Sequence, residues 1–146
     1  MNKLKLTPYI DRDGDAREML EFYHKLLGGK LRLSTFGEAP IKTPESDHGR
    51  ISHGRLDVEG YLTIMADDVM RDTPPPPKDS NINLALVGLD EDKLRKIFDG
   101  LSAGGKVTMA LEKQFWGDIF GMVTDKFGVH WLINIGDTEP HEPKNG

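Results

Sequence analysis

Cysteine is absent from this chain of 146 residues. Its absence excludes disulfide bonds, thiolate metal ligands and a cysteine nucleophile, and it suits a reducing compartment. Long apolar runs are missing as well. Residues 1–10 have no segment of signal-peptide length, and no stretch approaches the roughly 20 apolar residues that a membrane span requires. We therefore expect a cytoplasmic protein with no membrane partner.

An excess of basic residues is also lacking. The chain has 19 Lys and Arg against 24 Asp and Glu, which gives a net charge of -5. No basic surface is therefore predicted to neutralise phosphates, and we expect no nucleic-acid partner. The motifs of a phosphate loop, a dinucleotide-binding turn, a zinc protease and a nucleophile elbow do not occur. Hydride transfer, kinase chemistry and zinc-protease chemistry consequently have no support.

The most informative stretch that is present covers residues 115–134, which are predicted to form a β-hairpin. Its first strand alternates between two faces, and residues 125–128 supply a tight turn in which Gly128 can adopt a positive φ. Residues 129–135 are rich in β-branched and aromatic side chains, as is typical of a strand. We predict that one face of this hairpin packs on the core and that the other lines a pocket.

The rest of the chain repeats one order of elements. Each half is predicted to run strand, helix, strand, strand and strand, and four prolines at 74–77 separate the halves. Asp15 with Glu18 predicts a capping box at the first helix, and Asp90 is predicted to cap the second. The predicted strands cover residues 3–10, 30–36, 51–58, 61–66, 81–87, 106–110, 116–124 and 129–135. The predicted divisions are a first module at 1–67, a linker at 68–80, a second module at 81–136 and a tail at 137–146.

Several short motifs resemble those of one known family. They are Pro8-Tyr9-Ile10, Glu21-Phe22-Tyr23, Leu27-Gly28, His53-Gly54-Arg55-Leu56, Gly60 with residues 62–67, Phe115-Trp116-Gly117, Phe120-Gly121 and Asp125-Lys126-Phe127-Gly128, ahead of Trp131 and Asn134. With the tandem βαβββ order, they resemble the vicinal oxygen chelate superfamily of glyoxalases, bleomycin-resistance proteins and dioxygenases, and within it the PhnB-like group. The resemblance implies an α+β fold whose tandem βαβββ modules form a curved eight-stranded mixed sheet with a pocket, a small-molecule ligand and a homodimer.

The same resemblance implies where a divalent metal would be held. The metal ligands of the relatives would fall at about Pro8, Asn83 and Leu132, and none of these side chains is a strong ligand. No metal ligand and no cofactor are therefore assigned with certainty. The alternative is an altered divalent-metal site that uses His53 with Glu112 or Asn134.

The candidate site residues are those expected to face the pocket. His53 is the candidate catalytic residue, since a neutral imidazole can act as a base near pH 7, and its alternative role is that of a hydrogen-bonded strand histidine. Trp131 is expected in the core, and the acidic residues Asp67, Asp68 and Asp72 are expected to form a solvated edge. The candidate substrate-binding residues are Tyr9, Tyr61, Asn83, Trp116, Asp118 and Asn134.

Three functions remain open at this point. The first is a binding protein of the bleomycin-resistance kind, which holds an aromatic or amphiphilic molecule without changing it. The second is a metal-dependent lyase, isomerase or dioxygenase of the same superfamily with an altered metal site. The third is a dimerisation or partner-binding module whose trough is filled by side chains.

Overall fold

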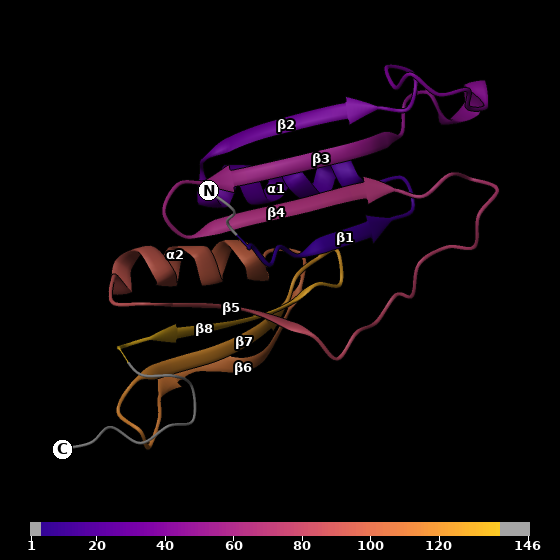
Figure 1. The fold of residues 1–146 in the computed structure, drawn as a ribbon. Coiled ribbons are helices and arrows are strands. Elements are labelled where there is room, and N and C mark those ends of the chain that lie inside the picture. The colour runs from indigo at the N-terminus through magenta and orange to yellow at the C-terminus, as the bar shows by residue number, and fades with distance from the viewer. Residues whose placement is uncertain (1–3, 138–146) are drawn as a thin grey trace. The chain divides into compact units, whose positions relative to one another are not determined.

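The computed structural model of the chain describes residues 4–137, which divide between Pro76 and Pro77 into two compact units. The first contains β1 (Tyr9–Arg12), α1 (Ala16–Leu27), β2 (Lys30–Thr35), the 3-10 helix η1 (Glu45–Asp47), β3 (Ile51–Val58) and β4 (Leu62–Asp68). The second contains β5 (Asn83–Gly88), α2 (Glu91–Ser102), β6 (Lys106–Lys113), β7 (Ile119–Thr124) and β8 (His130–Ile135) (Figure 1). Each unit is a βαβββ module, which confirms the predicted α+β class and the tandem repeat. Residues 138–146 of the predicted tail, with His141, lie outside the described residues.

Backbone hydrogen bonds arrange the eight strands as two mixed sheets of four. The strand order is β1-β4-β3-β2 in the first sheet and β5-β8-β7-β6 in the second. In each sheet the first strand of the module runs parallel to the last one, and the other neighbours are antiparallel. The two modules therefore repeat one topology as well as one order of elements.

One helix covers one face of each sheet. The apolar residues of α1 pack on β2, β3 and β4, and a side chain at Gly54 of β3 would overlap Leu20 of the helix. In the second module Gly121 of β7 gives the same close approach to Phe98 of α2. The buried helix residues, at the predicted helical spacing, are Ala16, Met19, Leu20, Tyr23 and Leu27 in α1 and Leu94, Ile97, Phe98 and Leu101 in α2.

The two α-helices have 12 residues each, and no helix within residues 4–137 has the length and apolar character needed to cross a bilayer.

Two predicted strands begin several residues before the observed ones. β1 begins at Tyr9 instead of residue 3, so only the end of the predicted strand pairs with a neighbour. β7 begins at Ile119 because a turn precedes it: the Gln114 N–H donates to the Asp118 carbonyl at 2.8 Å, and Gly117 has a φ of 96°. Trp116 and Asp118 therefore lie in the turn between β6 and β7, outside the alternation of a strand.

The start of α1 is stabilised from a distant part of the chain. The Asp68 carboxylate, buried at the end of β4, accepts hydrogen bonds from the N–H groups of Gly14, Ala16 and Ile51 at 2.9, 3.0 and 2.9 Å. The predicted capping box is wrong, because the Asp15 side chain makes no cap hydrogen bond and instead accepts from Arg12 at 2.7 Å. The predicted solvated edge is also wrong for Asp68, which is 2% exposed.

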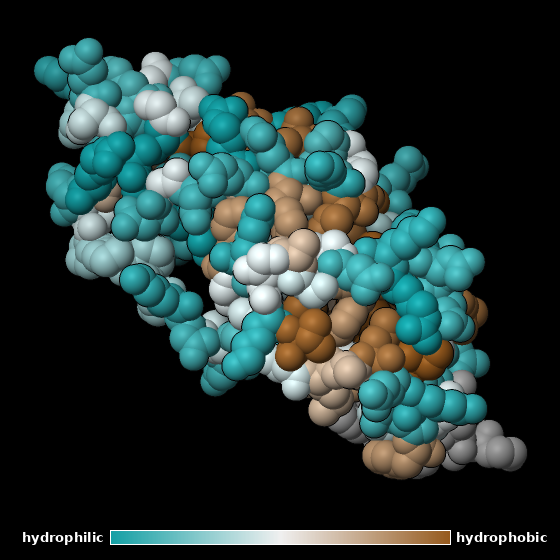
Figure 2. Space-filling model, turned by 180° about the vertical axis from the view of Figure 1, so that it is seen from behind, coloured by the Kyte–Doolittle hydropathy of each residue, from teal (hydrophilic) through white to brown (hydrophobic). Residues whose placement is uncertain are grey.

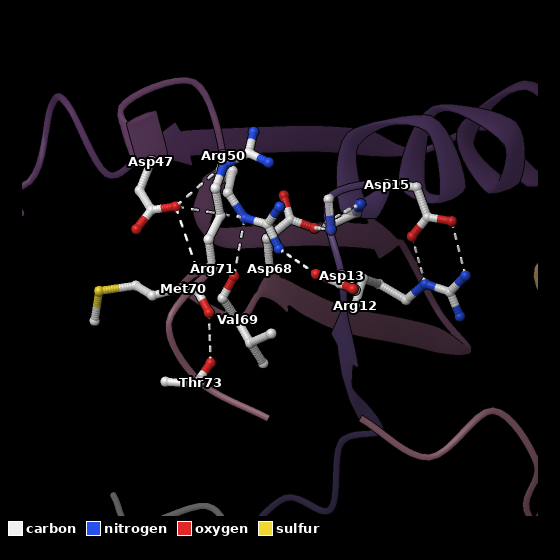
Figure 3. Close-up of polar contacts among 12 residues, drawn as sticks. Arg12, Asp13, Asp15, Asp47, Arg50, Asp68, Val69, Met70, Arg71 and Thr73 are labelled. Atoms are coloured by element: carbon white, nitrogen blue, oxygen red, sulfur yellow. Dashed lines mark hydrogen bonds and ion pairs between the residues drawn. The ribbon is translucent and has the colours of Figure 1, made fainter. Parts of the chain in front are cut away.

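The loop between β2 and β3 joins the same polar network (Figure 3). Arg50 is buried and donates to the Val69 carbonyl at 2.9 Å and to the Asp13 carboxylate at 2.7 Å. Asp47 is buried as well and accepts from the Arg71 N–H at 3.3 Å. These contacts attach the loop to the ends of β1 and β4, and they close one end of the first module.

Candidate functional site

The face of the first sheet that points away from α1 carries a cluster of ionisable side chains. We call this face the open face, and we call Tyr9, Asp11, His53 and Asp67 the tyrosine cluster. In the parallel pair of β1 and β4, Asp11 lies opposite Asp67, and Tyr9 lies two residues earlier on the same face. The register of β3 against β4 brings His53 beside Asp67. Three strands therefore contribute to one patch.

Tyr9 connects the members of the cluster. Its hydroxyl donates to Asp67 Oδ2 at 3.4 Å and lies 3.4 Å from His53 Nδ1, and the ring centroids of Tyr9 and His53 are 5.9 Å apart. Both hydroxyl contacts are long for an O–H donor, whose usual distance is about 2.7–2.8 Å. Tyr9 is 48% exposed and His53 is exposed as well, whereas Asp67 is half-buried. The phenol and the imidazole can therefore exchange their weak contacts for contacts with a bound molecule.

The surroundings of Tyr9 and Asp67 raise the pKa of both side chains and so favour their protonated forms. Burial of the carboxyl and its hydrogen bond with Asp11 raise the pKa of Asp67 from 3.8 to about 7. Burial and the neighbouring Asp67 carboxyl raise the pKa of Tyr9, so that its hydroxyl stays protonated at neutral pH. Near pH 7, Asp67 is thus able to donate or to accept a hydrogen bond.

The comparisons with known proteins agree with this architecture. The family model of the glyoxalase/bleomycin resistance protein/dioxygenase superfamily matches residues 8–133. The chain belongs to this superfamily. Protein YjdN of Escherichia coli (strain K12) is 32% identical over 151 residues, which cover 94% of this chain and 99% of YjdN. The predicted superfamily is therefore confirmed.

Solved structures share the fold of this chain. The crystal structure of protein PA1353 from Pseudomonas aeruginosa has a TM-score of 0.83 and 33% identity, and the match covers 93% of this chain and 100% of PA1353. A PhnB protein from Bacillus cereus has a TM-score of 0.68 and 24% identity, with coverage of 91% and 100%. The match to the second structure shows likeness of fold.

The superfamily is associated with a divalent metal, and the donor set of this chain does not fit one. Within residues 4–137, no group of three or more His, Asp or Glu side chains is placed so that it could hold a metal ion. Of the positions implied by the relatives, Pro8 precedes β1, Asn83 begins β5 and Leu132 lies in β8. None of these three offers an imidazole or a carboxylate. His53 belongs to the first unit, and Glu112 belongs to the second, where it is exposed on β6.

The structure brings three predicted residues of the second module together. Asn134 of β8 is fully buried and donates through Nδ2 to Asp118 Oδ2 at 2.9 Å. Trp116 lies in the same turn as Asp118, is 4% exposed, and packs edge-on against Phe120 at 5.6 Å between ring centroids. A side chain at Gly136 would overlap the Asp118 carboxyl. This group is therefore tightly packed at one end of the second sheet.

The other predicted substrate-binding residues each lie apart from the group in their own unit. Tyr61 is in the turn between β3 and β4 and is 48% exposed. Asn83 is exposed on β5 and lies opposite His130 of the neighbouring strand β8. Trp131 is in the core, as expected, and donates to the buried Asp125 carboxylate at 2.9 Å.

The residues that the sequence pattern missed are Asp11 and Asp67. The predicted fourth strand stopped at residue 66, one residue before Asp67, whereas β4 continues to Asp68. One further residue of the same alternation places Asp67 on the face shared with Thr63 and Met65. The pairing of β4 with β1 was still required to bring Asp67 to Tyr9.

The middle of the open face of the second sheet is apolar, whereas the open face of the first is charged. Polar and charged side chains, Asn83, His130, Thr124 and Lys106, lie at one end of the second face. Val87 of β5 and Met109 of β6 are 45% and 42% exposed, and Met122 and Leu132 between them are half-buried. Figure 2 shows that hydrophobic residues reach the surface at several places on the side of the molecule turned away in Figure 1. The two modules therefore offer two chemically different faces.

Proposed function

We propose that this protein of the glyoxalase/bleomycin resistance superfamily binds a small aromatic or amphiphilic molecule at the tyrosine cluster. The observation that carries the proposal is the position of the Tyr9 hydroxyl, 3.4 Å from both His53 Nδ1 and Asp67 Oδ2 on an exposed sheet face. A phenol, an imidazole and a carboxyl that can bear a proton offer several hydrogen bonds to one ligand.

The role of His53 follows from the same contact. Its side chain is exposed and its Nδ1 faces the Tyr9 hydroxyl, so a bound molecule could replace Tyr9 as its hydrogen-bond partner. His53 remains our candidate for any acid–base step on the ligand. Binding without turnover is the function that the donor set supports best, since the residues do not fit a resident metal.

The proposal is tested by ligand-observed NMR with a library of aromatic and amphiphilic fragments. Fragments that bind the native protein are then titrated into Asp67→Ala and His53→Ala variants. We expect the affinity to fall by about tenfold for each change, because each removes one hydrogen bond to the ligand. The matched control is Asp72→Ala, which removes an exposed carboxylate outside the cluster and should leave the affinity unchanged. The proposal is wrong if no fragment binds or if all three variants bind equally well.

The metal-dependent alternative has its own test. Elemental analysis of protein purified without a chelator, with thermal shifts on addition of nickel, manganese or iron, measures metal binding directly. A stoichiometric metal together with metal-stimulated turnover of a bound fragment would replace the binding proposal by the lyase, isomerase or dioxygenase alternative.

We also propose a homodimer in the cytoplasm. Support for pairing comes from β6, an eight-residue edge strand that is exposed along nearly its whole length. Light scattering after size exclusion tests the dimer: a monomer mass across the micromolar range would contradict it. The cytoplasmic location stays a prediction from the sequence.

A further inference from the structure

Two arginines face each other on the open face of the first sheet. Arg32 of β2 and Arg55 of β3 are direct cross-strand partners, so their side chains leave the sheet on the same side. That side is the one with the tyrosine cluster, because Arg55 alternates with the buried Gly54 and Leu56, which face α1. Like charges directly opposite each other destabilise a sheet unless a counter-charge lies between them.

Arg55 is already held in place by a chain of polar contacts. Its Nε donates to Asp57 Oδ2 at 2.6 Å, and Thr63 Oγ1 donates to Asp57 Oδ1 at 2.8 Å. The hydrogen bonds from Arg55 and then Thr63 lower the pKa of Asp57 to about 2, so the carboxylate is ionised at neutral pH. Asp57 therefore orients Arg55 through Nε, and the two terminal amino groups of the guanidinium remain for another acceptor.

No acceptor of this kind is present for Arg32. Its side chain is exposed and makes no hydrogen bond or ion pair with any side chain of residues 4–137. Lys30 lies two residues away on the same face, and Lys5 reaches that face through a 3.4 Å contact with Thr63. Four cations thus stand around the single carboxylate of Asp57, which leaves a local excess of positive charge.

We propose that Arg32 and Arg55 form a subsite for an oxyanion, a carboxylate or a phosphate group, on the small molecule that the open face binds. The planar forks of two guanidinium groups suit either oxyanion. Arg55 is two residues from His53 on one strand, about 7 Å along the sheet. A single small molecule can therefore place its acidic group on the arginines and its remaining polar groups on the tyrosine cluster. The inference rests on the proposed function and adds the class of ligand, an amphiphile with an acidic end.

The test follows the Nε–H signals of the arginines by ¹⁵N NMR at pH 7. Sodium phosphate and sodium acetate are titrated separately at constant ionic strength against sodium chloride, so that the two arms distinguish a phosphate from a carboxylate site. We expect saturable shifts of the Arg32 and Arg55 signals with at least one probe. In Arg32→Gln, affinity for that probe should fall at least fivefold. The matched control, Arg17→Gln, removes an exposed arginine from α1 on the other side of the sheet and should leave the affinity unchanged.

The outcomes separate this inference from the proposed function. Equal responses to phosphate, acetate and chloride, or unchanged affinity in Arg32→Gln, would overturn the anion subsite. If fragments nevertheless bind at the tyrosine cluster, the proposed function stands without it. If the oxyanions bind and no fragment does, the proposed function fails while the arginine pair remains an anion site.

Discussion

The two modules share one topology but start their helices in different ways. In the first, the cap of α1 comes from Asp68, which lies 52 residues beyond Ala16 and is buried at the end of β4. In the second, Asp90 directly precedes α2, and its exposed carboxylate accepts from the Lys93 N–H at 3.2 Å. The same requirement, an acceptor for the free N–H groups of a helix start, is met once by a tertiary contact and once locally.

The open faces differ more than the packed ones. Most helix-facing residues of both sheets are apolar, whereas the open face is charged in the first module and apolar in its middle in the second. Packing against a helix restricts which side chains a position accepts, and exposure removes that restriction. The two modules thus share an apolar side under the helix and differ in the side chains of the opposite side.

The largest effect is expected for Asp68→Ala. The change leaves three N–H groups without their acceptor in a buried place, which should cost about 3 kcal/mol or more. Hydrogen exchange should rise throughout α1 while α2 is unaffected. Trp116 and Trp131 both lie in the second unit, so their fluorescence should follow the unfolding of that unit and not the unfolding of the first. Asp72→Ala is the control. If Asp68→Ala lowers the free energy of unfolding by less than about 1 kcal/mol, the tertiary cap of α1 is no stronger than the local cap of α2.

The local cap of α2 should matter less. Asp90→Ala removes one exposed N-cap acceptor, for which about 1 kcal/mol is expected. Urea unfolding followed by tryptophan fluorescence measures it. Asp90→Asn retains a side-chain acceptor and should restore most of the loss. A cost as large as that of Asp68→Ala would show that both caps are equally important.

The charged open face of the first module should make the stability of the protein depend on pH. The pKa of Asp67 is about 7 in the folded protein and 3.8 without the fold, so the unfolded chain binds fewer protons between these values and stability falls as the pH rises through that window. Asp67→Asn should therefore be more stable than the native protein at pH 8, by about 0.5–1 kcal/mol after allowance for solvent screening, with little difference at pH 4. Urea titrations across this range test it, and a gain that is independent of pH would contradict it.

The smallest change in stability is expected for a substitution on the open face of the second sheet. Val87→Thr exchanges similar shapes at a position that is 45% exposed, so the free energy of unfolding should change by less than about 0.5 kcal/mol. Leu86→Thr, at the neighbouring buried position, is the contrasting variant and should cost clearly more. If Val87→Thr proves as costly as Leu86→Thr, the face around Val87 is covered in the native protein.

Local periodicity in the sequence was enough to predict much of the secondary structure. Alternation with a period of two residues and stripes with a period near 3.6 predicted the order of elements, both helices and the duplication, because these patterns depend only on which neighbours share a face. The superfamily was predicted from the resemblance of several short motifs to those of a known family. The alternation also placed His53 and Arg55 on one face of one strand. None of these conclusions required a contact between distant residues.

Only the tertiary structure decided which residues share a site. Tyr9 and Asp67 are 58 residues apart, and they meet because β1 pairs in parallel with β4 at one particular register. The same pairing carries Asp68 to the start of α1 and makes the local capping box unnecessary. Register is set by the packing of whole strands against a helix, and a shift of one residue would turn every one of these side chains to the opposite face.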